Sequence, residues 1–235
     1  SLRELNLVDN RVGKDGAQAL ADAVASETCT LRLLDLNSNK LYDEGALALA
    51  DAVASEASTL QTLNLRSNGL RTGGARMLAG GLASETCSLR TLVLTFNKVG
   101  DDGARWLANA VASEACTLRT LNLGYNMIGD DGAEALADAM ASETCTLREL
   151  NLQGNEVGEE GTQALADVLA SEASALHTLR IGGNGTGEER VPALAGALAR
   201  ETCTLHTLEL SCMVGVEGAR ALADALASEG CTLHS

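Results

Sequence analysis

Aromatic side chains and proline are nearly absent from this sequence. Only 2% of its 235 residues are Phe, Trp or Tyr, and proline occurs once. A folded core must therefore be filled by small and aliphatic side chains, and hydrophobic residues make up 46% of the chain. Long hydrophobic runs are missing too, because Asp and Glu interrupt each Ala-rich stretch, so we expect no membrane span. The chain does not open with a basic segment followed by an apolar run, so we expect no secretory signal.

Basic residues are scarce as well. The chain has 17 Lys and Arg against 32 Asp and Glu, which gives a net charge of -15. A protein that follows a nucleic-acid backbone needs clustered cations, so this balance argues against nucleic-acid binding and favours a basic protein partner. Yet 25 of the 32 acids stand just before, in the middle or at the end of Ala-rich segments. There, helix capping and solvation explain them better than partner recognition does.

Patterns for metal binding, phosphate binding and catalysis are also missing. No C-x-x-C or Cys/His zinc pattern occurs, and the Gly-rich segment 182–187 contains neither G-x-G-x-x-G nor G-K-[ST]. No Ser-His-Asp or paired-carboxylate arrangement can be argued, so we expect no enzyme, no metal and no cofactor. One alternative is a zinc site made from the only three histidines, which share one repeated position: His177, His206 and His234.

The sequence consists of eight consecutive copies of one unit. The first seven copies have 29 residues and the eighth has 28. Each unit opens with a leucine, at Leu2, Leu31, Leu60, Leu89, Leu118, Leu147, Leu176 and Leu205. The x-L-x-L run after the opening leucine has a period of two and predicts a short strand, and the following G-A-x-x-L-A run predicts a helix. Repetition at this period predicts a stacked array.

Strands joined by helices must run parallel, with right-handed crossovers. The sequence therefore predicts an α/β fold over residues 1–235, a right-handed solenoid with the parallel sheet on the concave face and the helices on the convex face. Helices pack farther apart than strands do, so we expect the stack to bend into an open horseshoe arc. The first and last repeats carry no distinct polar cap, so we expect missing flanking sequence, a partner or end-to-end self-association.

The repeated motif L-x-x-L-x-L-x-x-N-x-[VIL]-G-x-x-G-A-x-x-L-A resembles the ribonuclease-inhibitor type of leucine-rich repeat. This type also occurs in NOD-like receptors and in the Ran GTPase-activating protein. The resemblance implies a horseshoe that binds a protein without catalysis. Two alternatives stay open, an architectural subunit of a larger assembly and a Ran-type GTPase activator.

Six of the seven cysteines occupy one repeated position, two residues before the next opening leucine. They are Cys29, Cys87, Cys116, Cys145, Cys203 and Cys231. A repeated position indicates packing, so we expect buried, reduced thiols and a cytoplasmic location. An asparagine also recurs once per repeat, at Asn10, Asn39, Asn68, Asn97, Asn126, Asn155 and Asn184. We expect these amides to form a structural ladder that satisfies backbone groups of neighbouring loops.

Positions on the strands that point away from the helices vary between repeats, which is typical of a recognition surface. We predict partner binding there and just past the strands, through Phe96, Tyr125, Arg66, Asn64, Val93, Asn122, Thr95 and Gln153. Phe96 and Tyr125 are two of only four aromatic residues and share one position in adjacent repeats. The competing interpretation is that both rings only pack over a loop. We expect Trp106, in a helical segment, to pack on the convex side.

A second row combines Arg residues, one position after the opening leucines, with Glu residues at the ends of the helical segments. We expect these two rows to form ion pairs. The Arg row is Arg3, Arg32, Arg90, Arg119 and Arg148. The Glu row is Glu27, Glu56, Glu85, Glu114, Glu143, Glu172, Glu201 and Glu229. Each such exposed pair adds little stability.

Overall fold

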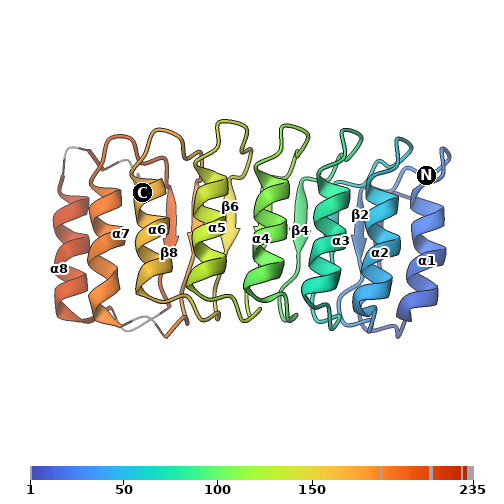
Figure 1. Cartoon of the computed structure of the whole chain (residues 1–235), viewed down its shortest axis with the longest axis horizontal. Coiled ribbons are helices and arrows are strands. Elements are labelled where there is room, and N and C mark those ends of the chain that lie inside the picture. The colour runs from blue at the N-terminus through green and yellow to red at the C-terminus, as the bar shows by residue number, and fades with distance from the viewer. Residues whose placement is uncertain (1, 186, 212–213, 229, 232–235) are drawn as a thin grey trace.

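The protein is represented by a computed structural model that describes residues 2–185, 187–211, 214–228 and 230–231. Strands and helices alternate along the chain (Figure 1). The strands are β1 (Glu4–Asn6), β2 (Leu33–Asp35), β3 (Thr62–Asn64), β4 (Thr91–Val93), β5 (Thr120–Asn122), β6 (Glu149–Asn151), β7 (Thr178–Arg180) and β8 (Thr207–Glu209). The α-helices are α1 (Gly13–Val24), α2 (Tyr42–Val53), α3 (Thr72–Leu82), α4 (Gly100–Val111), α5 (Asp130–Met140), α6 (Glu159–Leu169), α7 (Val191–Leu198) and α8 (Gly215–Leu226). A short 3-10 turn, η1 (Glu188–Arg190), precedes α7.

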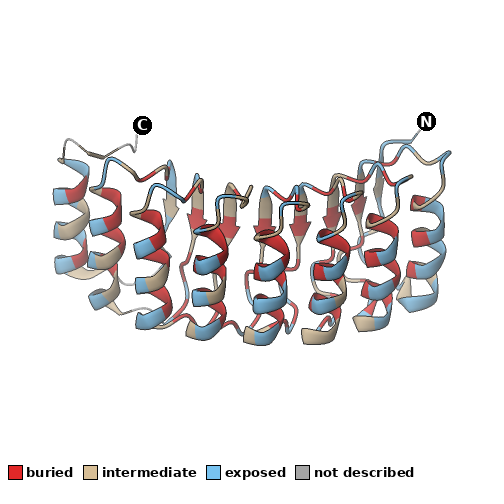
Figure 2. Cartoon of the chain, turned by 45° about the horizontal axis from the view of Figure 1, so that its top comes forward, coloured by how far each residue is buried: buried red, intermediate tan, exposed pale blue. Residues whose placement is uncertain are grey.

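The eight strands form one parallel sheet in sequence order. Each strand pairs with the next in a register of one repeat, so that Leu34 lies opposite Leu63 and Leu63 lies opposite Leu92. The helices stand in one row and the strands in a second row behind them (Figures 1 and 2). The predicted α/β solenoid is thereby confirmed, and its sheet is open. Within the described residues, no helix is long and apolar enough to cross a membrane.

The core lies between the sheet and the helices. In β2 to β7 the central leucine is fully buried and its two neighbours are only partly covered. Each buried leucine contributes about 1.5–3 kcal/mol. Ala46, Ala75, Ala104 and Ala133 are also fully buried, and their small side chains allow the helices to lie close to the sheet. The buried positions of the helices face the sheet (Figure 2), so the opposite face of the sheet is left open.

The asparagine row joins neighbouring repeats through hydrogen bonds. Nδ2 of Asn97 donates to the Leu65 carbonyl of the preceding repeat at 3.0 Å and to Leu94 of its own repeat at 2.8 Å. Its Oδ1 accepts the backbone N–H groups of Asn68 and Leu70 at 3.1 and 3.0 Å. The six later members of the row are buried.

Asn10, the first member of the asparagine row, is exposed instead. Its Nδ2 donates only to Val8 of its own loop, at 2.9 Å, because no repeat of the described chain packs on its outer side. The expectation of a buried amide that bridges two loops is therefore wrong for Asn10 alone, since bridging needs a preceding repeat.

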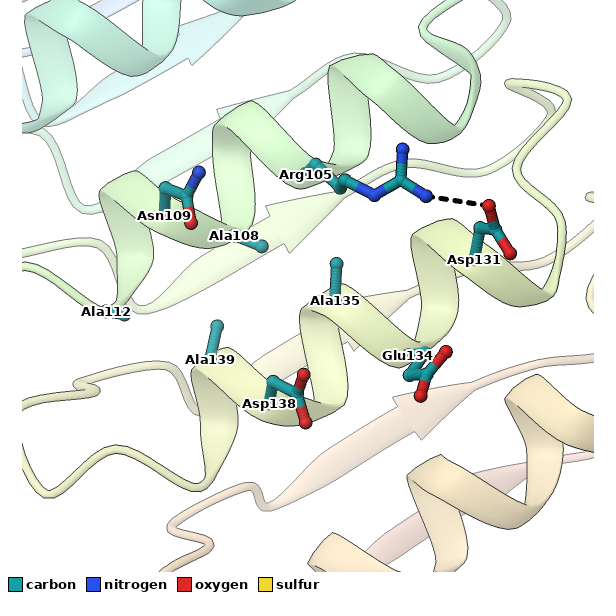
Figure 3. Close-up of a pocket in the computed structure, with 9 residues that line it drawn as sticks. All are labelled: Arg105, Ala108, Asn109, Ala112, Asp131, Glu134, Ala135, Asp138 and Ala139. Carbon is teal, nitrogen blue, oxygen red and sulfur yellow. Dashed lines mark hydrogen bonds and ion pairs between the residues drawn. The ribbon is translucent and has the colours of Figure 1, made fainter.

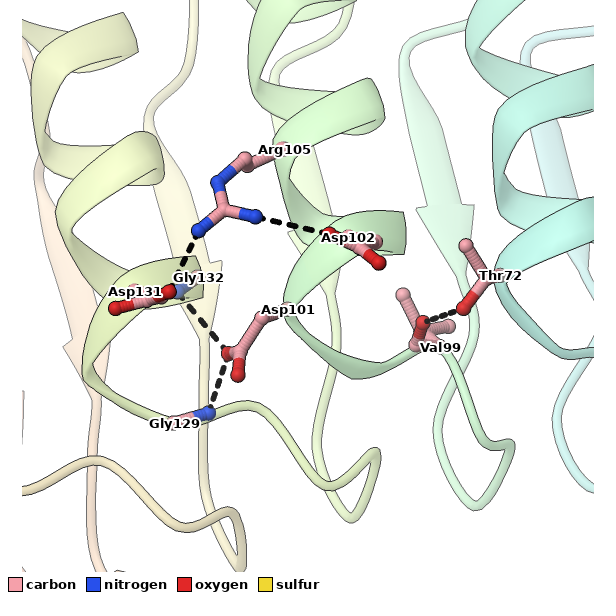
Figure 4. Close-up of polar contacts among 8 residues, drawn as sticks. All are labelled: Thr72, Val99, Asp101, Asp102, Arg105, Gly129, Asp131 and Gly132. Atoms are coloured by element: carbon pink, nitrogen blue, oxygen red, sulfur yellow. Dashed lines mark hydrogen bonds and ion pairs between the residues drawn. The ribbon is translucent and has the colours of Figure 1, made fainter.

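Acids before the helices connect repeats in a similar way. Oδ1 of Asp101, at the start of α4, accepts the N–H groups of Gly129 at 2.7 Å and Gly132 at 3.0 Å, at the start of α5 (Figure 4). Asp130 makes the same contacts one repeat later. No described helix is capped by the side chain of its own N-cap residue. These acids therefore cap the next helix of the stack, which couples adjacent repeats.

The cysteine row lies at the edge of this core. None of the six cysteines in the described part of the chain forms a disulfide. Cys87, Cys116 and Cys203 are buried as expected, whereas Cys29, Cys145 and Cys231 are partly exposed. Burial raises the pKa of the Cys116 thiol, and its neighbours Cys87 and Cys145 raise it further. A thiol with a raised pKa stays protonated at neutral pH and reacts slowly.

Candidate functional site

Three side chains from consecutive repeats stack just beyond the ends of their strands. The rings of Phe96 and Tyr125 are parallel within 6°, with their centroids 4.3 Å apart. The guanidinium carbon of Arg66 lies 4.6 Å from the centroid of the Phe96 ring, in cation–π geometry. Beyond Tyr125, a Cβ at Gly154 would overlap the Tyr125 ring, so this ring lies against the Gly154 backbone. The result is a continuous stack, hereafter the ring stack, of Arg66, Phe96, Tyr125 and Gly154.

The two rings stand at a backbone position that does not suit them. Phe96 has φ 56° and Tyr125 has φ 58°, in the left-handed region that bulky residues rarely adopt. Every other described repeat from the first to the seventh has positive φ here, with small or polar residues: Asp9, Ser38, Ser67, Gly154 and Gly183. Large rings at such a position cost conformational free energy. An outlier of this kind motivates a functional hypothesis, because strained residues concentrate at ligand sites.

The rings of Phe96 and Tyr125 are not buried in the core. Phe96 is 44% exposed and Tyr125 is 42% exposed, and Met127, two residues beyond Tyr125, is 57% exposed. The interpretation in which the rings only pack over a loop accounts for their faces, which are covered, but not for their exposed edges. Two exposed side chains near this surface were not among the predicted residues: Met127, and Tyr42, which is 51% exposed and lies against Gly69. Met127 directly follows the asparagine row, where side-chain type varies between repeats. Tyr42 stands where most other repeats carry glycine, and these two departures were the available signals.

The strands beneath the ring stack supply its floor. Asn64, Val93 and Asn122 are aligned in adjacent strands and are partly exposed. Val93 therefore presents an apolar spot between two amides. The Thr95 hydroxyl donates to Oδ1 of Asn122 at 2.8 Å, and Thr95 is only 7% exposed. Thr95 can thus hold Asn122 in place, but it offers little surface of its own.

Gln153 lies one repeat farther along and is partly exposed. Its backbone N–H donates to Oδ1 of Asn151 at 2.8 Å. Asn64 and Asn122 bind the N–H two residues ahead in the same way, at 3.1 Å in each case. This local turn fixes the direction in which the chain leaves each strand. The structure therefore brings Arg66, Phe96 and Tyr125 into direct contact and places the other predicted residues around them.

The expected pairing of the Arg row with the Glu row does not occur among the described residues. The ion pairs there join Arg105 to Asp102 and Asp131, Arg180 to Glu209, and Arg220 to Glu217. Glu229 lies outside the described residues. The expectation was wrong for the described residues, where the guanidinium of Arg148, for example, donates to the carbonyls of Leu147 and Ala175 instead of to a carboxylate. Arg3, Arg32, Arg90 and Arg119 are exposed and lie in no ion pair with any described carboxylate.

The histidine row is only partly described, because His234 lies outside the described residues. His177 and His206 meet edge to face, with ring centroids 4.9 Å apart. Burial, with His206 and Arg148 nearby, lowers the pKa of His177. The described residues contain no group of three His, Cys, Asp or Glu side chains that could hold a metal.

The helix side carries a separate groove of about 400 Å³ between α4 and α5 (Figure 3). Its walls include Ala108 and Ala135, and an ion pair of 2.7 Å between Arg105 and Asp131 crosses it. The groove follows from the small side chains of packed helices and brings no reactive groups together. Trp106 lies nearby on α4, 44% exposed, with the Arg76 guanidinium 5.3 Å from its ring centroid.

These features define an α/β repeat protein with an open parallel sheet and an exposed, preorganised surface at the ends of its middle strands. The chain belongs to the leucine-rich repeat family, because that family model matches more than half of it. The matched residues are 1–21, 28–50, 56–79, 86–108, 114–137 and 144–166. Proteins of this family generally mediate protein–protein interaction and are typically not enzymes.

No curated protein matches the sequence. Among solved structures, a TDR receptor is similar at 15% identity, over 94% of this chain and 37% of the receptor chain, with a TM-score of 0.47. An internalin from Listeria monocytogenes is similar at 19% identity, over 93% of this chain and 69% of the internalin chain, with a TM-score of 0.40. The chain therefore spans well under half the length of the receptor chain.

Proposed function

We propose that this chain is a non-catalytic protein-interaction module that binds a protein partner on the concave, sheet side of repeats three to five. The observation that carries the proposal is the ring stack, two half-exposed rings held parallel at 4.3 Å. Aromatic and Arg side chains are the commonest energetic anchors of protein interfaces. Here both kinds are already fixed in place, which lowers the entropy lost on binding.

The surroundings of the ring stack fit a contact surface. Asn64, Val93 and Asn122 give a mixed floor of amides and one apolar side chain, and Met127 adds an adaptable apolar edge. Thr95 holds the Asn122 side chain in place, and Gln153 borders the surface. On the other side of the molecule, Trp106 is equally exposed and has the Arg76 guanidinium near its ring, but no second aromatic ring stacks on it among the described residues.

The proposal extends to the subtype of the repeat and to the compartment of the protein. Residues 1–235 form one leucine-rich repeat domain of the ribonuclease-inhibitor type, with eight repeats that open at the leucines named above. The domain works in a reducing, cytoplasmic compartment, a proposal supported by the repeated cysteine position, at which no described residue forms a disulfide.

Site-specific photo-crosslinking tests the proposal. A photoreactive phenylalanine analogue is placed at Tyr125, or at Trp106 as a control of similar exposure, and each chain is irradiated in extract of the organism that encodes it. We expect a discrete protein adduct from position 125, suppressed by excess unlabelled wild-type chain but not by the Phe96→Ala variant. Adducts that form only from position 106, or that the Phe96→Ala variant suppresses equally well, would contradict the proposal.

A further inference from the structure

Charge is distributed unequally between the two sides of each repeat. The sheet-side segment runs from the residue after the opening leucine to the residue after the ladder asparagine, as in 119–127. These segments hold ten of the 17 Lys and Arg but only six of the 32 acids, a net charge of +4. The remaining residues hold seven cations and 26 acids, a net charge of -19. The strongly acidic character of the chain therefore belongs to its helix side.

The imbalance is sharpest in the repeats that carry the ring stack. Segments 61–69, 90–98 and 119–127 contain four cations and no acid. The cations are Arg66, Arg90, Lys98 and Arg119. All four are exposed, and in the part of the chain that the structure describes none of them lies in an ion pair. They form a positive surface, at whose border the Asp35 carboxylate accepts a hydrogen bond from the Asn64 amide at 3.0 Å.

The cations frame the sheet at both ends of the middle strands. Arg90 and Arg119 stand just before β4 and β5, whereas Arg66 and Lys98 follow the ends of β3 and β4, and Arg66 lies on the Phe96 ring. The Arg66 guanidinium covers a ring face, yet its N–H groups have no acceptor in the described chain. A planar guanidinium held in this way can donate two parallel hydrogen bonds to a carboxylate.

The ring stack also restricts what can bind. Phe96 has Arg66 on one face and Tyr125 on the other, and the far side of Tyr125 lies against Gly154. No ring face is left on which a nucleic-acid base could stack, and stacking on open faces is how single strands are held. The exposed ring edges carry the positive end of the ring quadrupole, which attracts carboxylates and packs against aliphatic groups.

We propose that the surface of Arg66, Lys98, Phe96, Tyr125 and Arg119 binds an acidic segment of a protein partner. Its carboxylates contact the cations, and an apolar side chain contacts the ring edges. The inference rests on the proposed function and names the chemistry of the partner. It reverses the expectation of a basic partner, which was drawn from the net charge of the whole chain. The acidic helix side repels a long polyanion, so the fitting occupant is a short acidic stretch of polypeptide.

Peptide selection tests this proposal. A random peptide display library is selected on the immobilised whole chain, and labelled copies of the enriched peptides are titrated by fluorescence anisotropy at low and high salt. Each peptide is also titrated against the Phe96→Ala/Tyr125→Ala variant, which identifies the peptides that use the ring stack. Circular dichroism verifies that every variant is folded.

Two matched substitutions isolate the role of charge. Lys98→Glu reverses an exposed positive charge of the surface. Arg200→Glu makes the same change of charge at an exposed residue after α7, which lies in no ion pair among the described residues. We expect ring-dependent peptides to be rich in Asp and Glu, to bind more weakly at high salt, and to lose about tenfold in affinity on Lys98→Glu but less than about twofold on Arg200→Glu.

The outcomes separate the two proposals. Ring-dependent peptides that are neutral or basic, or that bind Lys98→Glu as tightly as wild type, would overturn the acidic partner while leaving the proposed function intact. If no enriched peptide depends on the rings, the proposed function itself fails. Ring-dependent binding of a labelled oligothymidylate as tight as that of the peptides would also overturn the inference, in favour of nucleic acid.

Discussion

Replacement of Asn97 by alanine tests the physical basis of the stack. Asn97 is 5% exposed, and its side chain makes four hydrogen bonds of 2.8 to 3.1 Å to the backbone. Its loss leaves the N–H groups of Asn68 and Leu70 and the carbonyl of Leu65 without a partner. The Leu94 carbonyl keeps one, because Nδ2 of Asn126, 2.9 Å away, also donates to it.

These three backbone groups without a partner determine how much stability Asn97→Ala loses. A buried polar group without a partner costs about 1–3 kcal/mol, and partial relaxation of the loops reduces the sum, so we expect Asn97→Ala to lower the free energy of unfolding by about 4 kcal/mol. Asn10→Ala is the matched control. It removes one exposed hydrogen bond to Val8, so we expect a loss below about 0.5 kcal/mol.

Urea denaturation followed by far-UV circular dichroism measures both losses. Native-state hydrogen exchange supplies a local readout, in which the amides of Asn68 and Leu70 lose protection in Asn97→Ala. A loss below about 1 kcal/mol for Asn97→Ala, or equal losses for the two variants, would refute the assignment of inter-repeat coupling to the asparagine row.

Three further predictions follow from individual contacts. Gly154 has φ 68° and lies against the Tyr125 ring. Gly154→Ala should therefore displace that ring and destabilise the fold by more than about 1 kcal/mol. Unchanged NMR resonances of the Tyr125 ring would contradict this. Asp101→Ala should lower stability by about 1–2 kcal/mol in urea denaturation because it removes the cap of α5, and an equal loss in the exposed control Asp102→Ala would count against it. Because burial raises the pKa of Cys116 in the folded chain, its contribution to stability is present at lower pH and is lost above about pH 8.5. Wild type should therefore lose stability in alkali more steeply than Cys116→Ala, and identical pH profiles would disprove the effect.

The repeat architecture could be predicted because its signals are local and repeated. The leucine spacing fixes the strand and its buried face, and the 29-residue period fixes the register of the strands. The positions of Asn97 and its equivalents followed from the same reasoning. Asn10 did not, because burial of the ladder depends on a neighbouring repeat and not on the residue itself.

The contacts between repeats could not be predicted so well. Asp101 was expected to favour its own helix, but the offset between adjacent repeats places it at the start of the next one. The Arg and Glu rows were expected to pair from their closeness in sequence, which says nothing about side-chain direction. The stacking of Phe96 on Tyr125 likewise depends on the spacing of adjacent repeats and on an unusual backbone conformation. The net charge of the chain does not give the charge of the sheet side, because it averages over two sides of opposite charge.

The most direct test of the account is the affinity of the crosslinked partner for a chain without the two rings. Isothermal titration calorimetry of that partner compares wild type with the Phe96→Ala/Tyr125→Ala variant, and Trp106→Ala provides a control of equal exposure on the helix side. We predict at least about 30-fold weaker binding for the double variant, which corresponds to the loss of about 2 kcal/mol typical of one interface anchor, and no change for Trp106→Ala. Wild-type affinity in a folded double variant, or an equal loss in Trp106→Ala, would contradict the placement of the binding surface at the ring stack.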